Sequence, residues 1–146
     1  MNGIEFKIAR EGLHLTQQEL ADLWAVSLRT VQRWEKGKFT IPNDRAEQLT
    51  MYYVDIYKAF GNFCGFIEKQ KLSKTDEVYL LAYNADNYDG DFEHFKLHFK
   101  LLEECKFHLQ DKVKVKIVEM DEPAYCEWLG TREDTQQARA TWASFQ

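Results

Sequence analysis

The residues best able to do chemistry are concentrated in one short segment, LRTVQRWEKGK, at positions 28–38. It contains two arginines, two lysines and a glutamine. Arginine and glutamine side chains can each form two hydrogen bonds with the edge of a guanine or an adenine. The major groove of DNA admits one α-helix. A helix that carries these side chains on one face would therefore suit sequence recognition in that groove.

The helical period assigns the side chains of this segment to two faces. Val31 and Trp34 are its large apolar members, three residues apart, and we expect them to face the protein core. The opposite face then carries the predicted base contacts, which are Leu28, Arg29, Gln32 and Arg33. Either arginine would bind a guanine, the glutamine an adenine, and the leucine would lie against a thymine methyl. Without a suitable scaffold, the same residues would form only a solvated helix face.

The flanking residues predict that scaffold. Thr16 followed by Glu19 forms the capping-box pattern, which starts a helix after a first helix over residues 2–12. Ser27 can cap the next helix, and Gly37 ends it from the position after the C-cap. Two short helices joined by a turn of about three residues make a helix-turn-helix.

The segment LTQQELADLWAVSLRTVQRWEKGKFTIP resembles the helix-turn-helix of phage Cro and lambda-type repressors, over about residues 4–50. Its ending, W-E-K-G-K-x-x-I-P followed by a long helix, is similar to small anti-CRISPR-associated-type regulators and their uncharacterised bacterial relatives. The resemblance implies a transcription regulator of a phage or bacterium that binds double-stranded DNA. Two residues depart from the pattern: Ala25 replaces the usual glycine of the turn, and Trp24 replaces a smaller aliphatic residue.

A second set of residues is predicted to contact the DNA backbone. The resemblance assigns Gln17 to a phosphate at the start of the first motif helix, where the helix end is positive. The remaining members of the set are Ser27, Thr30, Lys36 and Lys38. Such contacts position a protein on DNA without supplying sequence information. We expect Glu35 either to pair locally or to brace the end of the helix, and not to face DNA.

Charge is distributed unevenly along the chain, whose formal net charge is -5. Residues 1–45 contain seven Lys and Arg against six Asp and Glu, a net of +1, whereas residues 46–146 contain twelve against eighteen, a net of -6. Only the first third can therefore present a basic face, which favours binding at one patch. The sequence has no long apolar run, no signal peptide and no paired cysteine motif, so we expect a cytoplasmic protein without a membrane segment.

The remaining sequence predicts an α+β fold with two domains and a tail. A four-to-five-helix DNA-binding domain with a long last helix covers residues 1–69, and a small α/β domain covers residues 78–130. In the latter, a buried strand over 78–84, a helix over 92–109 and an alternating strand over 113–118 predict a βαβ unit. The polar tail, residues 131–146, is either frayed or an arm that binds a partner.

A two-stranded sheet is marginal alone, and a second copy of the chain is the simplest source of further strands. We therefore expect a homodimer and a repressor, itself autoregulated, that binds an inverted repeat. The alternative is an antitoxin-like module that binds its operator and a protein partner through its C-terminal domain. RNA ranks last, because the outward face of the motif offers no stacking aromatic residue.

Other clusters predict no catalytic, metal or cofactor site. His94 and His98 share a helix side with His108 and Cys105, but their neighbours are phenylalanine and lysine, and no H-E-x-x-H pattern occurs. No phosphate-binding glycine loop and no nucleophile with a nearby base is present. We therefore do not expect an enzyme.

Overall fold

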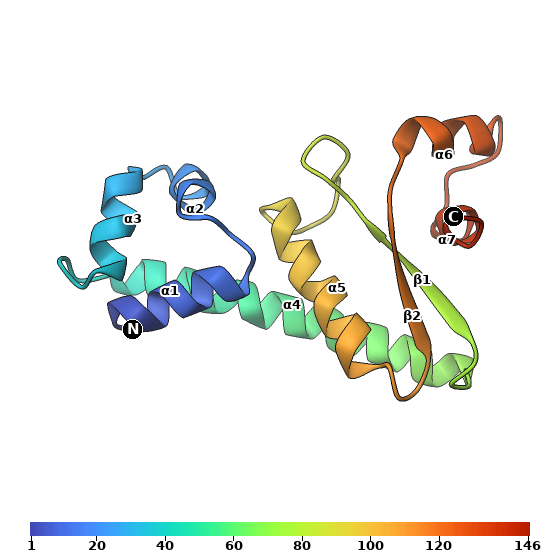
Figure 1. Ribbon diagram of the computed structural model, residues 1–146, viewed down its shortest axis with the longest axis horizontal. Helices are drawn as coiled ribbons and strands as arrows, with labels where there is room; N and C mark the ends of the chain where they lie inside the picture. The colour runs from blue at the N-terminus through green and yellow to red at the C-terminus, as the bar shows by residue number, and fades with distance from the viewer. The chain divides into compact units, whose positions relative to one another are not determined.

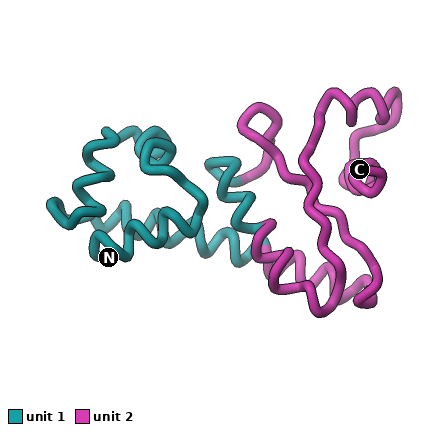
Figure 2. Tube along the Cα trace, viewed as in Figure 1, with its two compact units in different colours: residues 1–59, 92–101 teal, residues 60–91, 102–146 magenta.

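The computed structural model describes residues 1–146 and has an α+β fold, as predicted (Figure 1). Its elements, in chain order, are α1 (Gly3–Gly12), α2 (Gln17–Leu23), α3 (Leu28–Glu35), α4 (Asn43–Gln70), β1 (Glu77–Ala82), α5 (Phe95–His108), β2 (Lys114–Glu119), α6 (Glu122–Leu129) and α7 (Gln136–Ala143). The chain forms two compact units, residues 1–59 with 92–101 and residues 60–91 with 102–146 (Figure 2). The predicted domain limits, 69 and 78, stay a prediction.

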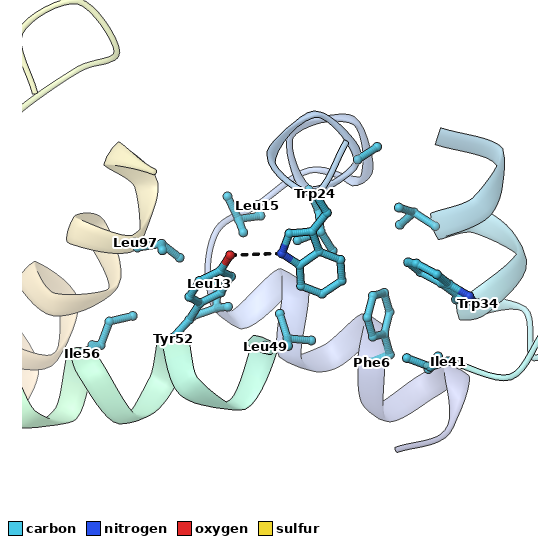
Figure 3. Close-up of a cluster of buried hydrophobic side chains, with 13 residues drawn as sticks. Phe6, Leu13, Leu15, Trp24, Trp34, Ile41, Leu49, Tyr52, Ile56 and Leu97 are labelled. Atoms are coloured by element: carbon cyan, nitrogen blue, oxygen red, sulfur yellow. Dashed lines mark hydrogen bonds between the residues drawn. The ribbon is translucent and has the colours of Figure 1, made fainter. Parts of the chain in front are cut away.

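Three aromatic rings form the centre of the N-terminal unit. Phe6 of α1 contacts Trp24 and Trp34 with ring centroids 6.0 and 5.8 Å apart, and the two indoles lie 6.4 Å from each other. Trp24 also donates its indole N–H to the hydroxyl of Tyr52 over 3.0 Å (Figure 3). The unusual tryptophan at position 24 is therefore fully accommodated, because its ring is buried and its polar atom is paired.

Local capping explains where the first three helices begin. Asn2 with Glu5, and Thr16 with Glu19, form reciprocal capping boxes at α1 and α2, and the Ser27 hydroxyl accepts the Thr30 amide at α3. The predicted caps at positions 16 and 27 are confirmed.

The same three helices end in the same way. Each is followed by a residue with positive φ: His14 at 63°, Ala25 at 51° and Gly37 at 67°. After α2, the amide of Ala25 bonds the carbonyl of Asp22, and that of Val26 bonds the carbonyl of Ala21. This is the Schellman arrangement, and it recurs after α1 and α3. The turn of the motif thus keeps its left-handed residue although the side chain there is alanine.

The predicted strand–helix–strand order is present, with both strands in the second unit and α5 divided between the two units. β1 pairs with β2 in parallel, with Glu77 opposite Lys114 and Ala82 opposite Glu119, and α5 connects the strands. Val113 and Val115 are buried with Ile67 and Leu109, as the alternation predicts. Ile117, expected on the same buried face, is instead 42% exposed. α4 continues through both of its later glycines to Gln70.

Residues 131–146, for which the sequence predicted a tail, contain the helix α7. Thr135 caps this helix, and Trp142 and Ala143 are buried against Met120 and Tyr125. Two late apolar residues on a polar helix are therefore enough to pack it onto the second unit.

Candidate nucleic-acid interface

α3 has the two faces that its sequence predicts. Val31 and Trp34 are buried in the N-terminal core, with exposed fractions of 0% and 6%. On the other side Arg29 is exposed, and Leu28, Gln32 and Arg33 are half-buried. Gly3 allows α1 to begin against the end of α3, because an added Cβ would lie 2.5 Å from the carbonyl oxygen of Trp34. This close approach of α1 fixes α3 on the core.

A hollow of about 320 Å³ lies along α3 and the loop that follows it. The residues that line it are Arg29, Gln32, Arg33, Lys36, Lys38 and Phe39. The structure thus brings together three of the four predicted base contacts and two of the five predicted backbone contacts. Four of the six lining side chains are cationic and none is acidic, so the hollow is suited to an anionic polymer such as DNA.

Phe39 also lines this hollow, although the sequence patterns did not indicate it. Its ring is 51% exposed, and the guanidinium carbon of Arg33 lies 4.8 Å from the ring centroid. A cation over an aromatic face is held by the ring quadrupole, so Phe39 orients the Arg33 side chain. The available signal was a phenylalanine in an otherwise polar loop, KGKFT, directly after the helix.

The only carboxylate on α3 points away from the hollow. Glu35 accepts a hydrogen bond from Arg10 Nε at 2.6 Å and another from Gln17 Nε2 at 2.6 Å. The side chains of Arg10 and Glu35 are only 6% and 5% exposed. Glu35 therefore turns away from the hollow, as expected, but its partners lie 25 and 18 positions away and are not local, and its negative charge is neutralised inside the unit instead of repelling a phosphate.

The side chains of the remaining predicted backbone contacts already have partners within the protein. The Gln17 amide nitrogen is engaged by Glu35, although the residue stays half-exposed at the start of α2. The Ser27 hydroxyl caps α3 and lies 2.8 Å from the Thr30 hydroxyl. Contacts of these three residues with DNA stay a prediction.

A series of hydrogen bonds through Tyr52 of α4 stiffens the packing of the helix-turn-helix. Tyr52 accepts from Trp24 and donates to Glu93 Oε2 at 2.7 Å. Burial, together with the hydrogen bond to Glu93, raises the pKa of Tyr52 to about 12. The phenol therefore remains a donor at all physiological pH values.

Two capped helices, a left-handed turn and a cationic outer face define the class: a DNA-binding helix-turn-helix protein. Comparison with protein families agrees, since residues 6–53, about a third of the chain, match a family model described as Helix-turn-helix. Residues 6–53 thus form a helix-turn-helix like that of the Cro and lambda-repressor (XRE-like) type, and the match supports a DNA-binding transcription regulator. Proteins of this family are regulators and not enzymes. Comparison with curated proteins gave no significant match.

The narrower likeness to anti-CRISPR-associated regulators stays a prediction.

None of the helices is both long and apolar enough to span a membrane.

Proposed function

We propose that the protein is a dimeric repressor that binds an inverted repeat, including one in the control region of its own operon. The observation that carries the proposal is the cationic hollow on the outward face of α3. Two copies related by a two-fold axis would present two such helices to successive major grooves, about 34 Å apart. A protein bound there would block transcription by occupying the DNA.

Within this proposal the side chains divide into two roles. Arg29, Gln32 and Arg33 contact base edges, and Leu28 contacts a thymine methyl. Backbone phosphates are bound by Gln17, Ser27, Thr30, Lys36 and Lys38. The outward position of these side chains supports the base contacts, because the outward side chains of α3 are the ones that a major groove would meet.

The proposal is tested by a mobility-shift assay with DNA from upstream of the protein's own gene. Arg33→Ala removes a bidentate donor, and we expect affinity to fall roughly 5- to 150-fold, the equivalent of about 1–3 kcal/mol. Lys74→Ala, which removes one positive charge from an exposed loop of the other unit, is the control and should bind like the wild type. Equal affinity of the wild type and Arg33→Ala would contradict the assigned role.

Salt gives a second measure in the same assay. Affinity should decrease linearly with salt on a double-logarithmic plot, because phosphate contacts release counterions. Lys36→Ala should lower the magnitude of that slope by about one, without changing the preferred sequence.

A further inference from the structure

Phe39 is a large apolar side chain outside every hydrophobic core of the protein. Its ring is 51% exposed and belongs to none of the buried clusters. The guanidinium carbon of Arg33 lies over this ring, 4.8 Å from the centroid. Burial therefore does not explain the position of this phenylalanine, and its contact with Arg33 is the alternative.

The backbone after α3 holds the ring in this position. Gly37, at φ 67°, turns the chain back over the last turn of the helix. The amides of Lys38 and Phe39 then both donate to the Arg33 carbonyl, over 2.9 and 3.4 Å. Two residues later Ile41 is buried, with 6% of its surface exposed. The loop is thus fixed on both sides of Phe39, so the ring is in place before DNA binds.

The other polar side chains that α3 contributes to the hollow are not held in this way. Arg29 and Gln32 line the hollow together with Arg33. Neither of the first two side chains forms a hydrogen bond, an ion pair or a cation–π contact within the protein, whereas Arg33 has its ring. Arg33 is therefore the one polar side chain among the predicted base contacts that is positioned in advance.

Such positioning has a consequence for base selection. A guanidinium over a ring keeps its N–H groups at its edge, and that edge matches the O6 and N7 acceptors of guanine. Adenine presents an amino donor where guanine presents O6, so a fixed guanidinium would face one acceptor and one donor. An arginine that moves freely can turn to a phosphate instead, where it supplies no sequence information. Restriction of Arg33 therefore favours the contact with guanine.

We infer that Phe39 is a specificity-determining residue, which positions the Arg33 guanidinium for one guanine in each half-site of the DNA. Phe39 acts through Arg33 and is a positioning residue. The inference rests on the proposed function and deepens it, because it names the base that one side chain selects and the residue that enforces the selection.

The test compares DNA duplexes that differ at one base pair. DNA enriched from a random pool by the full-length wild type supplies the parent duplex. The base pair whose preference is lost in Arg33→Ala identifies the guanine. Dissociation constants are then measured with guanine and with adenine at that position, and their ratio is the guanine preference.

Two variants of Phe39 separate the ring from its apolar character. Phe39→Leu keeps an apolar side chain without a ring face, and we expect the guanine preference to fall roughly two- to fivefold, the range for an exposed cation–π contact. Phe39→Tyr keeps the ring and should retain the wild-type preference. In an Arg33→Ala background, Phe39→Leu should have no further effect, because the side chain that it positions is absent.

The same measurements contain their controls. Base pairs that do not depend on Arg33 should keep their preferences in Phe39→Leu. The slope of affinity with salt should also be unchanged, because no charge is removed. Since the ring is half exposed, both variants should unfold at the wild-type temperature.

An unchanged guanine preference in Phe39→Leu would overturn the inference and leave the proposed function standing. Equal weakening with guanine and with adenine would also overturn it, because that is the result of a merely structural role. So would an Arg33→Ala variant with wild-type preferences. Wild-type protein that enriches no DNA would contradict the proposed function itself, and the inference with it.

Discussion

The positive charge of Arg33 and the negative charge of Glu35 lie on different sides of α3. Arg33 lies over the ring of Phe39 on the hollow side, while Glu35 is held inside by Arg10 and Gln17. The separation leaves two arginines and a glutamine as the side chains that α3 contributes to the hollow, with no carboxylate. At the scale of residues, therefore, the interface depends as much on the removal of a carboxylate as on the presence of arginines.

Removal of one partner from the buried pair should be costly. Glu35→Gln removes the buried carboxylate that pairs with Arg10 and leaves only the exposed Glu11 carboxylate near the guanidinium, and we expect the free energy of unfolding to fall by about 3–5 kcal/mol. The control is Glu11→Gln, whose carboxylate also lies near Arg10, at 3.3 Å, but is 53% exposed. It should cost at most about 1 kcal/mol. Urea unfolding measures both, and equal effects would contradict the account.

The positive-φ residues allow a paired test of the turns. Ala25→Gly removes the strain of a Cβ at φ 51°, and we expect the protein to gain up to about 1 kcal/mol of stability. Gly37→Ala, at φ 67° with no atom within 4 Å of the added carbon, should lose about the same amount. Thermal unfolding monitored by circular dichroism gives the order of stability. A glycine variant at position 25 less stable than the wild type would refute this explanation.

At the scale of elements, α7 is attached through the polar contacts of Arg139 with Asp89, Asp134 and Tyr83 and through the ring of Trp142. Arg139 donates from Nε and Nη2 to the two carboxylate oxygens of Asp134 at 2.9 and 2.7 Å, and its Nη1 donates to the Tyr83 hydroxyl at 2.8 Å. The hydrogen bonds from Arg139, with another from Tyr125, lower the pKa of Asp134 to about 2. Beside this pair, the indole of Trp142 is buried against Tyr125.

This attachment should weaken in acid. Because the folded-state pKa of Asp134 lies below its ordinary value of 3.8, its stabilising contribution is complete above about pH 4 and is lost as pH falls towards 2. We expect the indole N–H resonance of Trp142 to leave its native chemical shift over that range. Asp134→Asn should already show the displaced resonance at neutral pH. A resonance that is native in that variant would contradict the role of the pair.

Most of the N-terminal elements could be predicted because their signals are local. The caps at Thr16 and Ser27, and the apolar spacing of Val31 and Trp34, lie within one or two helical turns of what they determine. The ion pair of Arg10 with Glu35 spans 25 positions, and no periodicity marks it.

Two further features could not be predicted for the same reason. Residues 92–101 join the N-terminal unit through Leu97, which is buried beside Ile56 (Figure 3), and through Lys96, whose Nζ lies 2.8 Å from a Glu19 oxygen. These contacts connect distant positions of the chain. In α7 a mostly polar sequence masked the single large residue, Trp142, that packs it.

At the scale of the whole molecule, the two units have complementary tasks in our proposal. The N-terminal unit contributes the recognition helix, and the second unit contributes the surface for a second copy. The acidity of residues 46–146 is then compatible with DNA binding, because the net positive charge belongs to residues 1–45 alone.

The most direct test of the central claim is selection of double-stranded DNA from a random pool by the full-length protein. We predict enrichment of a two-fold symmetric sequence with half-sites about one helical turn apart, and a changed half-site preference for Arg33→Ala. Absence of any enriched sequence, or an identical preference in the variant, would contradict the claim that α3 recognises an inverted repeat.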